Sequence, residues 1–387
     1  KFAALLKNYI MVSDKFDSIR PYQGREEEIL ALNRIGSHPL LERISKYLYP
    51  EKNPKELGSS ISKLESVDDF QSQIMYYAIN RIIEKTSKSL SFSGIENLDN
   101  NSKYLFISNH RDILLDSAII QVILYKNGFQ TSEMAVGDNL ITDSFIEDIA
   151  RSNKMIKVVR STNPRELYSS SLLLSEYIRA KISENSSSIW IAQRNGRTKN
   201  GIDLTEQGLL KMLDMSGKGN FMSDFSQLNI VPISISYEYE PCDILKARET
   251  YISSKQKYIK SPGEDLNSIL TGIMQYKGDI HVHFGDKLNS EEIHNCSLLE
   301  KNERYKSLSE VIDNKIYQGY KLWPTNKIAY DLVNNSTLYN NEYSSSQKDK
   351  FIDYIDSKLS DISTDKSEIK DRLLNIYSNP VTIKNRS

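Results

Sequence analysis

The sequence predicts an α/β protein in which a central mixed sheet is flanked by helices, with helical additions at both ends. Short apolar or alternating runs occur between residues 96 and 290, and helical patterns separate several of them. Helical patterning also dominates before and after this part. We therefore predict an N-terminal helical region (1–95), an α/β domain (96–290) and a C-terminal helical region (291–387).

Composition excludes some classes of function and leaves others open. The net charge of -1 gives no indication of nucleic-acid binding. The two cysteines, Cys242 and Cys296, have no metal-ligand spacing and cannot form a disulfide framework, which fits a reducing cytosol. No apolar run approaches the ~20 residues that span a bilayer. If the protein acts on lipids, we expect it to act from the membrane surface.

The N-terminal region contains one well-marked helix start. Ser66 is suited to cap a helix, with Asp69 at the third position. The residues that then fall on one helix face are Phe70, Ile74, Tyr77, Ala78 and Ile82. We find no chemical constellation here and expect a helical platform packed on the next domain.

Six runs are predicted to be strands: Tyr104–Ser108, Glu133–Val136, Met155–Arg160, Ser188–Ala192, Ile230–Ser236 and Asp279–Phe284. Pro232 near the start of the fifth run indicates an edge strand or a strand end, because proline lacks the N–H that a ladder needs. Asn163, Pro164 and Glu166 predict a helix with a capping box, and Leu209–Met215 predicts another that ends near Gly217.

His110 is the strongest candidate for chemistry. It follows the strand Leu105–Ile107 and precedes a helical pattern that starts near Leu114. Side chains at the carboxyl end of a strand in an α/β sheet occupy the usual place for a reaction. A histidine there can act as a general base, and a nearby carboxylate, Asp112 or Asp116, can hold its tautomer. The alternative is that His110 is a loop residue and Asp112 a helix N-cap.

A second candidate is the turn after the strand Ser188–Ala192, which carries Arg194, Arg197 and Lys199. Guanidinium groups beside exposed backbone N–H groups suit a phosphate, although a solvated basic turn has the same pattern. Arg160, at another strand end, adds to this basic group. His281 and His283 alternate on one strand and share a face, but no third metal ligand is evident nearby.

These motifs together resemble those of the glycerol-phosphate acyltransferase superfamily. Asn109-His110 followed by an aspartate, a strand end with Gly196-Arg197, and Val231-Pro232-Ile233 occur in the order of that family. The family includes the glycerol-3-phosphate, dihydroxyacetone-phosphate and lysophosphatidate acyltransferases. The resemblance covers residues 100–240 and implies that family's fold.

The resemblance implies an acyl transfer from acyl-CoA or acyl-carrier protein to a hydroxyl of glycerol 3-phosphate or a 1-acyl-glycerol 3-phosphate, in phospholipid biosynthesis. His110 would be the base and Asp116 would orient it. Arg160, Arg194 and Arg197, with the Asn195-Gly196 turn, would bind the acceptor, and an apolar groove would take the acyl chain. No metal or organic cofactor is implied. The expected location is cytoplasmic, peripheral on the inner face of the membrane.

The sequence departs from the family pattern at two places. Five residues separate His110 from Asp116, where the family has four, and one extra helical residue rotates a side chain by ~100°. Either a bulge absorbs this rotation or Asp112 does part of the work; we favour Asp116, because Asp112 is well placed for capping. Asn195 stands where the family has glutamate, so the turn loses a charge.

Two alternatives follow from these departures and from the unknown acceptor. The protein could be a catalytically weak or inactive relative that binds lipid or a partner protein. It could also acylate a non-glycerol lipid acceptor.

Overall fold

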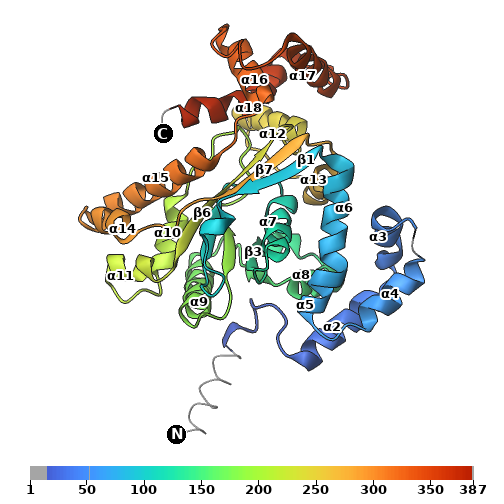
Figure 1. The fold of residues 1–387 in the computed structure, drawn as a ribbon, viewed down its shortest axis with the longest axis vertical. Helices are drawn as coiled ribbons and strands as arrows, with labels where there is room; N and C mark the ends of the chain where they lie inside the picture. The colour runs from blue at the N-terminus through green and yellow to red at the C-terminus, as the bar shows by residue number, and fades with distance from the viewer. Residues whose placement is uncertain (1–14, 52, 386–387) are drawn as a thin grey trace.

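The computed structural model describes residues 15–51 and 53–385. Its centre is a seven-stranded sheet with the order β1-β7-β6-β2-β5-β3-β4 (Figure 1). The strands are β1 (Ser89–Ser93), β2 (Leu105–Ser108), β3 (Glu133–Gly137), β4 (Met155–Val158), β5 (Ile189–Ala192), β6 (Ile230–Tyr237) and β7 (Asp279–Phe284). All six predicted strands are therefore confirmed, with small shifts at their ends.

The sheet is mixed, because β6 and β7 pair antiparallel whereas the other neighbouring strands pair parallel. The predicted fold class, a mixed sheet flanked by helices with helical additions at both ends, is confirmed. The prediction that residues 1–95 are helical is wrong for β1. This edge strand has only two large apolar residues, Leu90 and Phe92, and none of its residues is buried, so its hydrophobic signal is weak.

Helices cover both faces of the sheet (Figure 1). One core contains side chains of α6 (Tyr76–Thr86) and α7 (Leu115–Lys126) packed on the strands. The opposite core contains side chains of five helices: α9 (Pro164–Ser183), α10 (Gln207–Asp214), α11 (Phe221–Ser226), α14 (Ser290–Ser297) and α15 (Lys301–Gly319). The short turns η2 (Ile95–Asn97) and η3 (Asp138–Leu140) follow β1 and β3.

The N-terminal helices form a third core together with α8 (Ser144–Ser152). They are α2 (Arg25–Ser37), α3 (Leu40–Leu48), α4 (Pro54–Ser62), α5 (Val67–Phe70) and the π-helical segment η1 (Gln71–Met75). Ser66 caps α5 as predicted, because its hydroxyl accepts a hydrogen bond from the Asp69 backbone N–H at 3.0 Å. The helical prediction for residues 1–14 lies outside the described residues.

The C-terminal helices α16 (Pro324–Asn334), α17 (Ser345–Lys358) and α18 (Lys366–Lys384) share a fourth core with α12 (Asp243–Lys255). Helix α13 (Glu264–Met274) lies between α12 and β7 in the chain. Helix α15 packs on the sheet, whereas α16–α18 form this separate core. The division of the chain into three regions at residues 95 and 290 stays a prediction.

Two local predictions need correction. Strand β6 lies inside the sheet, so the edge reading of Pro232 is wrong; the strand-end reading fits, because pairing with β7 begins only at Ile233. Asn163 caps α9 and Pro164 begins it, but Glu166 does not close a capping box. Instead, the Glu166 carboxylate accepts a hydrogen bond from the Ser161 hydroxyl.

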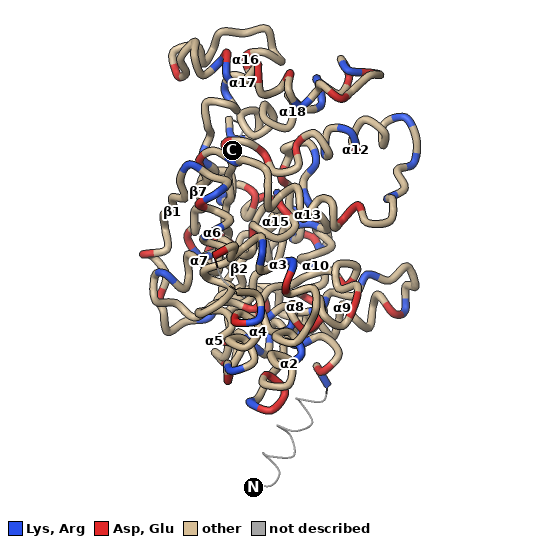
Figure 2. Tube along the Cα trace, turned by 90° about the vertical axis from the view of Figure 1, so that its right-hand side faces the viewer, with Lys and Arg blue, Asp and Glu red and all other residues tan. Residues whose placement is uncertain are grey.

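Lysine and arginine are interspersed with aspartate and glutamate along the described trace, in keeping with the near-zero net charge (Figure 2). Within residues 15–51 and 53–385, no helix is both long and apolar enough to cross a bilayer.

Candidate active site

The end of β2 is fixed by side chains that extend the sheet. The Asn109 amide donates to the Ile235 carbonyl at 2.9 Å and accepts from the Ile235 N–H at 2.8 Å, as a backbone peptide would. The Trp190 indole N–H donates to the Ser108 hydroxyl at 2.9 Å. Asn109 is fully buried, so its role is to set where the chain leaves β2.

His110 follows directly and contacts Asp116. Its Nδ1 lies 2.9 Å from Asp116 Oδ2, and its ring meets the Trp190 ring edge-on at 5.9 Å between centroids. The histidine side chain keeps some exposure while Asp116 is fully buried. With Nδ1–H donating to the carboxylate, Nε2 is left as the proton acceptor.

Asp116 is held by four donors from the loop and the neighbouring strand. Its Oδ2 also accepts the backbone N–H groups of Arg111 and Asp112, at 2.6 and 2.8 Å, and its Oδ1 accepts the Tyr237 hydroxyl at 2.7 Å. Burial alone raises the pKa of Asp116, but the His110 interaction, the Asp112 N–H and Tyr237 outweigh it and hold that pKa below its usual value. The carboxylate therefore stays ionised beside the imidazole.

Asp112 caps the N-terminus of α7. Its Oδ1 accepts the backbone N–H groups of Leu114 and Leu115, at 2.9 and 2.8 Å, at the start of α7. The extra residue of the motif is absorbed in this capped turn, because the Asp116 carboxylate folds back onto His110 and the backbone of the turn. Asp112 Oδ2 is buried without a hydrogen-bond partner among the described residues, and burial and the Asp116 charge raise the pKa of Asp112.

Below this loop lies a buried cluster of two cations and two anions. Arg111 pairs with Asp203 and, at 3.1 Å, with Glu240. The Lys246 ammonium donates to Glu240 Oε1 and to the Arg111 carbonyl, both at 2.6 Å. Each charge faces an opposite charge, so the cluster can exist without water. Lys246 thereby fixes the backbone of the residue between His110 and Asp112.

The basic turn after β5 is tied to the same loop, since the Thr198 N–H donates to the His110 carbonyl at 2.8 Å. Gly196 has a φ of 76°, which favours glycine. Arg197 is only 8% exposed, and its Nη1 is buried without a hydrogen-bond partner among the described residues. Its charge acts on Asp112 and on Asp265 of α13, opposing the rise in the pKa of Asp112.

Arg194 and the backbone of Asn195 have a different neighbour, Glu206. Glu206 lies 4.0 Å from Arg194 Nη2, and its other oxygen accepts the Asn195 backbone N–H at 3.1 Å. The Asn195 side chain is exposed. Glu206 thus brings to the turn the negative charge that Asn195 lacks.

Arg160 lies two residues beyond β4 and is exposed. Its guanidinium packs on Gly137 at the end of β3, where an added Cβ would meet Arg160 Nε at 2.7 Å and Asn139 Oδ1 at 2.6 Å. Asn139 in turn donates to Asp265 at 3.2 Å. Arg160 and Arg197 therefore both follow the carboxyl ends of parallel strands, β4 and β5, and the charge of Arg197 acts on the same Asp265.

The other histidines are engaged elsewhere. His281 Nδ1 and His283 Nδ1 hydrogen-bond the hydroxyls of Ser91 and Ser93, each at 2.9 Å, on the strands β1 and β7. Burial lowers the pKa of His281 to about 4. Across the described part of the chain, no group of three or more His, Cys, Asp or Glu residues could hold a metal ion.

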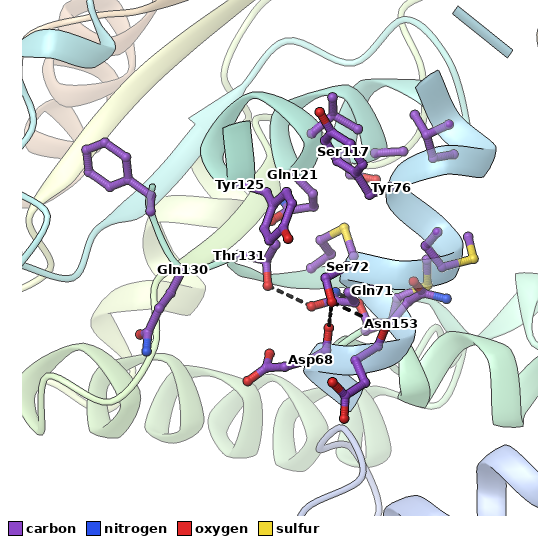
Figure 3. A pocket seen from close by; sticks show the side chains of 18 of the residues that line it. Asp68, Gln71, Ser72, Tyr76, Ser117, Gln121, Tyr125, Gln130, Thr131 and Asn153 are labelled. Carbon is purple, nitrogen blue, oxygen red and sulfur yellow. Dashed lines mark hydrogen bonds between the residues drawn. The ribbon is translucent and has the colours of Figure 1, made fainter. Parts of the chain in front are cut away.

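A cavity of about 380 Å³ lies next to the loop, between α7 and the segment formed by η1 and α6 (Figure 3). The α7 residues that line it fall on one face of the helix: Leu114, Ser117, Ala118, Gln121, Val122 and Tyr125. His110 is not part of the lining; Leu114 and Ser117, on either side of Asp116 in the chain, are the lining residues nearest to it in sequence. Polar groups close one side, where Thr131 donates to Gln71 at 2.7 Å.

Several site residues were not predicted. Arg111 and Tyr237 stood beside residues already singled out, and their position at strand ends was an available signal. Asp203, Glu240 and Lys246 had none, because they lie 92 to 135 residues from Arg111 in sequence.

Comparison with known proteins gives the following. A family model described as Acyltransferase matches residues 89–236. No curated protein matches the chain. Among solved structures, the crystal structure of the 1-acyl-sn-glycerophosphate (LPA) acyltransferase PlsC from Thermotoga maritima is similar. The TM-score is 0.41 and the identity 11%, over 76% of this chain and 95% of that one.

Proposed function

Because a family model described as Acyltransferase matches residues 89–236, we propose that this protein is an acyltransferase that moves a fatty acyl group to a hydroxyl of glycerol 3-phosphate or a 1-acyl-glycerol 3-phosphate. The donor is an acyl thioester, either acyl-CoA or acyl-carrier protein. The product is a precursor of phospholipids. The single observation that carries the proposal is the His110–Asp116 pair at 2.9 Å, with Nε2 left to accept a proton.

The reaction needs only groups of this chain. His110 Nε2 takes the proton from the acceptor hydroxyl as its oxygen attacks the thioester carbonyl. The ionised Asp116 stabilises the imidazolium that forms. The tetrahedral intermediate then collapses, the C–S bond breaks, and the leaving thiolate takes up the proton from the imidazolium. No covalent acyl-enzyme is required.

Arg197 is the best placed of the predicted basic residues to bind the acceptor phosphate. A buried guanidinium nitrogen without a partner is costly unless a ligand accepts its hydrogen bond, and a phosphate oxygen is a strong acceptor. Arg160 likewise follows the carboxyl end of a strand and is the second candidate. Arg194 Nε is also buried without a hydrogen-bond partner among the described residues, but the Glu206 carboxylate lies 4.0 Å from Arg194 Nη2 and accepts the Asn195 backbone N–H. This negative charge weakens the assignment of Arg194 and Asn195 to direct phosphate contacts.

The cavity beside α7 supports a place for the acyl chain. From Leu114 to Tyr125 the helix rises ~16 Å at about 1.5 Å per residue, which is roughly the length of a dozen methylenes. Ala118 lies on the lining face near the site end of this path. Ala118→Trp is expected to shift the preference from long to short acyl chains while turnover with a short chain persists. An unchanged chain-length preference would contradict the assignment of this cavity to the acyl chain.

The test of the proposed function is thioester consumption with glycerol 3-phosphate, dihydroxyacetone phosphate and lysophosphatidate as acceptors. We expect turnover with one of them, and its loss in His110→Ala. His294→Ala is the matched control, because His294 is an exposed histidine on α14, and it should keep full activity. Absence of turnover with all three acceptors would contradict the proposal. Equal turnover with acceptors that lack phosphate would indicate a non-glycerol lipid and contradict the role of Arg197.

The amphiphilic substrates lead us to propose that the protein works at a membrane surface, on the inner face of the cytoplasmic membrane. Asn195 keeps one alternative open, a relative that binds lipid without catalysis, since its turn lacks the family glutamate. Lipid binding that persists in a wild-type protein without turnover would favour that alternative.

A further inference from the structure

Helix α13 exposes three large apolar residues and buries two small ones, while Ile273 packs against the core of the sheet. Leu266, Leu270 and Met274 recur every four residues and are 61%, 45% and 56% exposed. Residues at this spacing lie on one face of a helix. Ser268 and Gly272, with the same spacing on the opposite face, are buried. A helix of a globular protein normally turns its apolar stripe inward, so an outward stripe indicates a partner outside the chain.

The buried face of α13 is small because it packs closely on the active-site loop. A Cβ added at Gly272 would lie 2.0 Å from Asp112 Oδ2, so only glycine permits this approach. The Cys242 thiol donates to the Ser268 carbonyl at 3.2 Å. One face of α13 therefore contacts the capped turn beside His110, and the other face carries the apolar stripe. The two faces are separated by one helix diameter, about 10 Å.

The connection before α13 continues this surface. Ile259 is 80% exposed, and the segment that follows α12 stands away from the body of the molecule (Figure 2). Lys255 is the last residue of α12, and the segment itself carries Lys257 and Lys260. Lys260 is paired with Asp265 at 2.6 Å, and Lys255 with Glu368 at 3.1 Å, whereas Lys257 forms no ion pair with any residue of 15–51 or 53–385. The Lys260 pair ties the connection to α13.

We propose that Ile259, Leu266, Leu270 and Met274, here named the α13 patch, enter the interfacial layer of an anionic lipid bilayer. Aliphatic side chains supply the insertion, and Lys257, which has no ion pair within the described residues, extends toward an anionic headgroup. The proposal rests on the proposed function, which requires an acceptor or product that resides in a membrane. The inference adds which surface faces the membrane. A bilayer in contact with α13 is separated from the His110 loop by one helix diameter, so a membrane-bound substrate has a short path to the site.

An acidic carrier protein is the competing occupant. The α13 patch favours a bilayer because it is a protruding set of aliphatic side chains, and two of the three lysines near it are already paired within the chain. Protein interfaces are instead enriched in aromatic residues, methionine and arginine, of which the patch has only Met274.

The experiment measures binding to vesicles of phosphatidylcholine with phosphatidylglycerol by sedimentation. The variant is the triple substitution Leu266→Ser, Leu270→Ser, Met274→Ser. The control is Leu298→Ser, because Leu298 is 70% exposed next to α14, on the other side of the molecule from α13 (Figure 1). We expect the triple variant to bind at least about tenfold more weakly and the control to bind like the wild type. Wild-type binding by the triple variant would overturn the proposal, as would absence of vesicle binding by the wild type.

A second measurement does not depend on how the triple variant folds. A polarity-sensitive fluorophore on Ile259→Cys should shift to the blue when vesicles are added, while the same label on Leu298→Cys should not. Cys242 and Cys296 are buried and leave the new thiol as the labelled one. No shift at position 259 would overturn the proposal.

Activity separates this inference from the proposed function. With short-chain acyl-CoA and glycerol 3-phosphate, both soluble, the triple variant should turn over like the wild type. Patch-dependent vesicle binding without any turnover would leave the α13 patch standing and contradict the proposed function. Normal vesicle binding with a loss of transfer from acyl-carrier protein alone would assign the patch to the carrier and overturn the bilayer.

Discussion

The substitution Asp116→Asn removes the negative charge beside His110 and preserves the shape of the side chain. Asp116 accepts four hydrogen bonds, three of them on Oδ2 from His110, Arg111 and Asp112. An asparagine with its oxygen in the Oδ2 position keeps these three, and the Tyr237 hydroxyl can turn to accept from the amide. The variant should therefore fold, and the change tests the charge alone.

The size of the effect follows from the lost charge. A hydrogen bond to a charged group contributes about 1.5–3 kcal/mol, against about 1 kcal/mol for a neutral one. The imidazolium forms only as the proton is transferred, so the loss falls mainly on the transition state. The difference is about 0.5–2 kcal/mol, so at about 1.4 kcal/mol per factor of ten we expect kcat to fall between roughly 2-fold and 30-fold.

The assay is steady-state turnover of a soluble acyl thioester with the preferred acceptor, in a double-mutant cycle with His110→Ala. Asp116 acts through His110, so Asp116→Asn should leave the residual rate of His110→Ala unchanged. If Asp116→Asn keeps the wild-type kcat, or if its effect is the same with and without His110, then the role assigned to Asp116 is wrong.

Three further predictions concern binding and stability. Arg197→Gln should raise KM for a phosphate-bearing acceptor by roughly 10-fold to 100-fold and leave KM for the thioester unchanged, because it removes a charge-assisted hydrogen bond; equal changes in both constants would contradict this. Burial raises the pKa of Asp313, on α15, to about 7, so the folded state binds a proton that the unfolded state has lost. The stability present below pH 4 should then fall as pH rises toward 7, and urea unfolding should show a flatter pH dependence in Asp313→Asn. Lys246→Met should destabilise the fold by about 3–5 kcal/mol, with partial recovery in Lys246→Met/Glu240→Gln, because one member of a buried pair is then not left alone.

Local patterns in the sequence were sufficient for the strands and for several caps. The β-branched, apolar content of runs such as Ile230–Ser236 predicts a buried strand. Ser66 and Asn163 predict helix starts, because their side chains cap the helices that follow. The same reasoning missed β1, because a half-exposed edge strand has little apolar content to report. It also placed Glu166 in a capping box that the structure replaces with a bond from Ser161.

The candidate site was only partly accessible in this way. The sequence favoured Asp116 as partner and Asp112 as cap from their positions relative to the helix, and the structure places them so. The sequence analysis grouped Arg194 with Arg197, yet these two side chains, three positions apart on one turn, have different neighbours. The structure turns Arg194 toward Glu206 and buries Arg197.

The sequence by itself determined the α/β class, most of the strands and the pairing of His110 with Asp116. Tertiary structure alone decided which distant groups support them: Tyr237 reaches Asp116 across 121 residues, and Lys246 reaches the Arg111 carbonyl across 135. It also decided that α13 turns its apolar stripe outward, because Gly272 packs on Asp112. The physical reason is that the periodicity of apolar residues depends only on which face of each segment is buried. Pairing between distant buried groups depends on strand order and on which helix covers which strand end, and no local pattern records that.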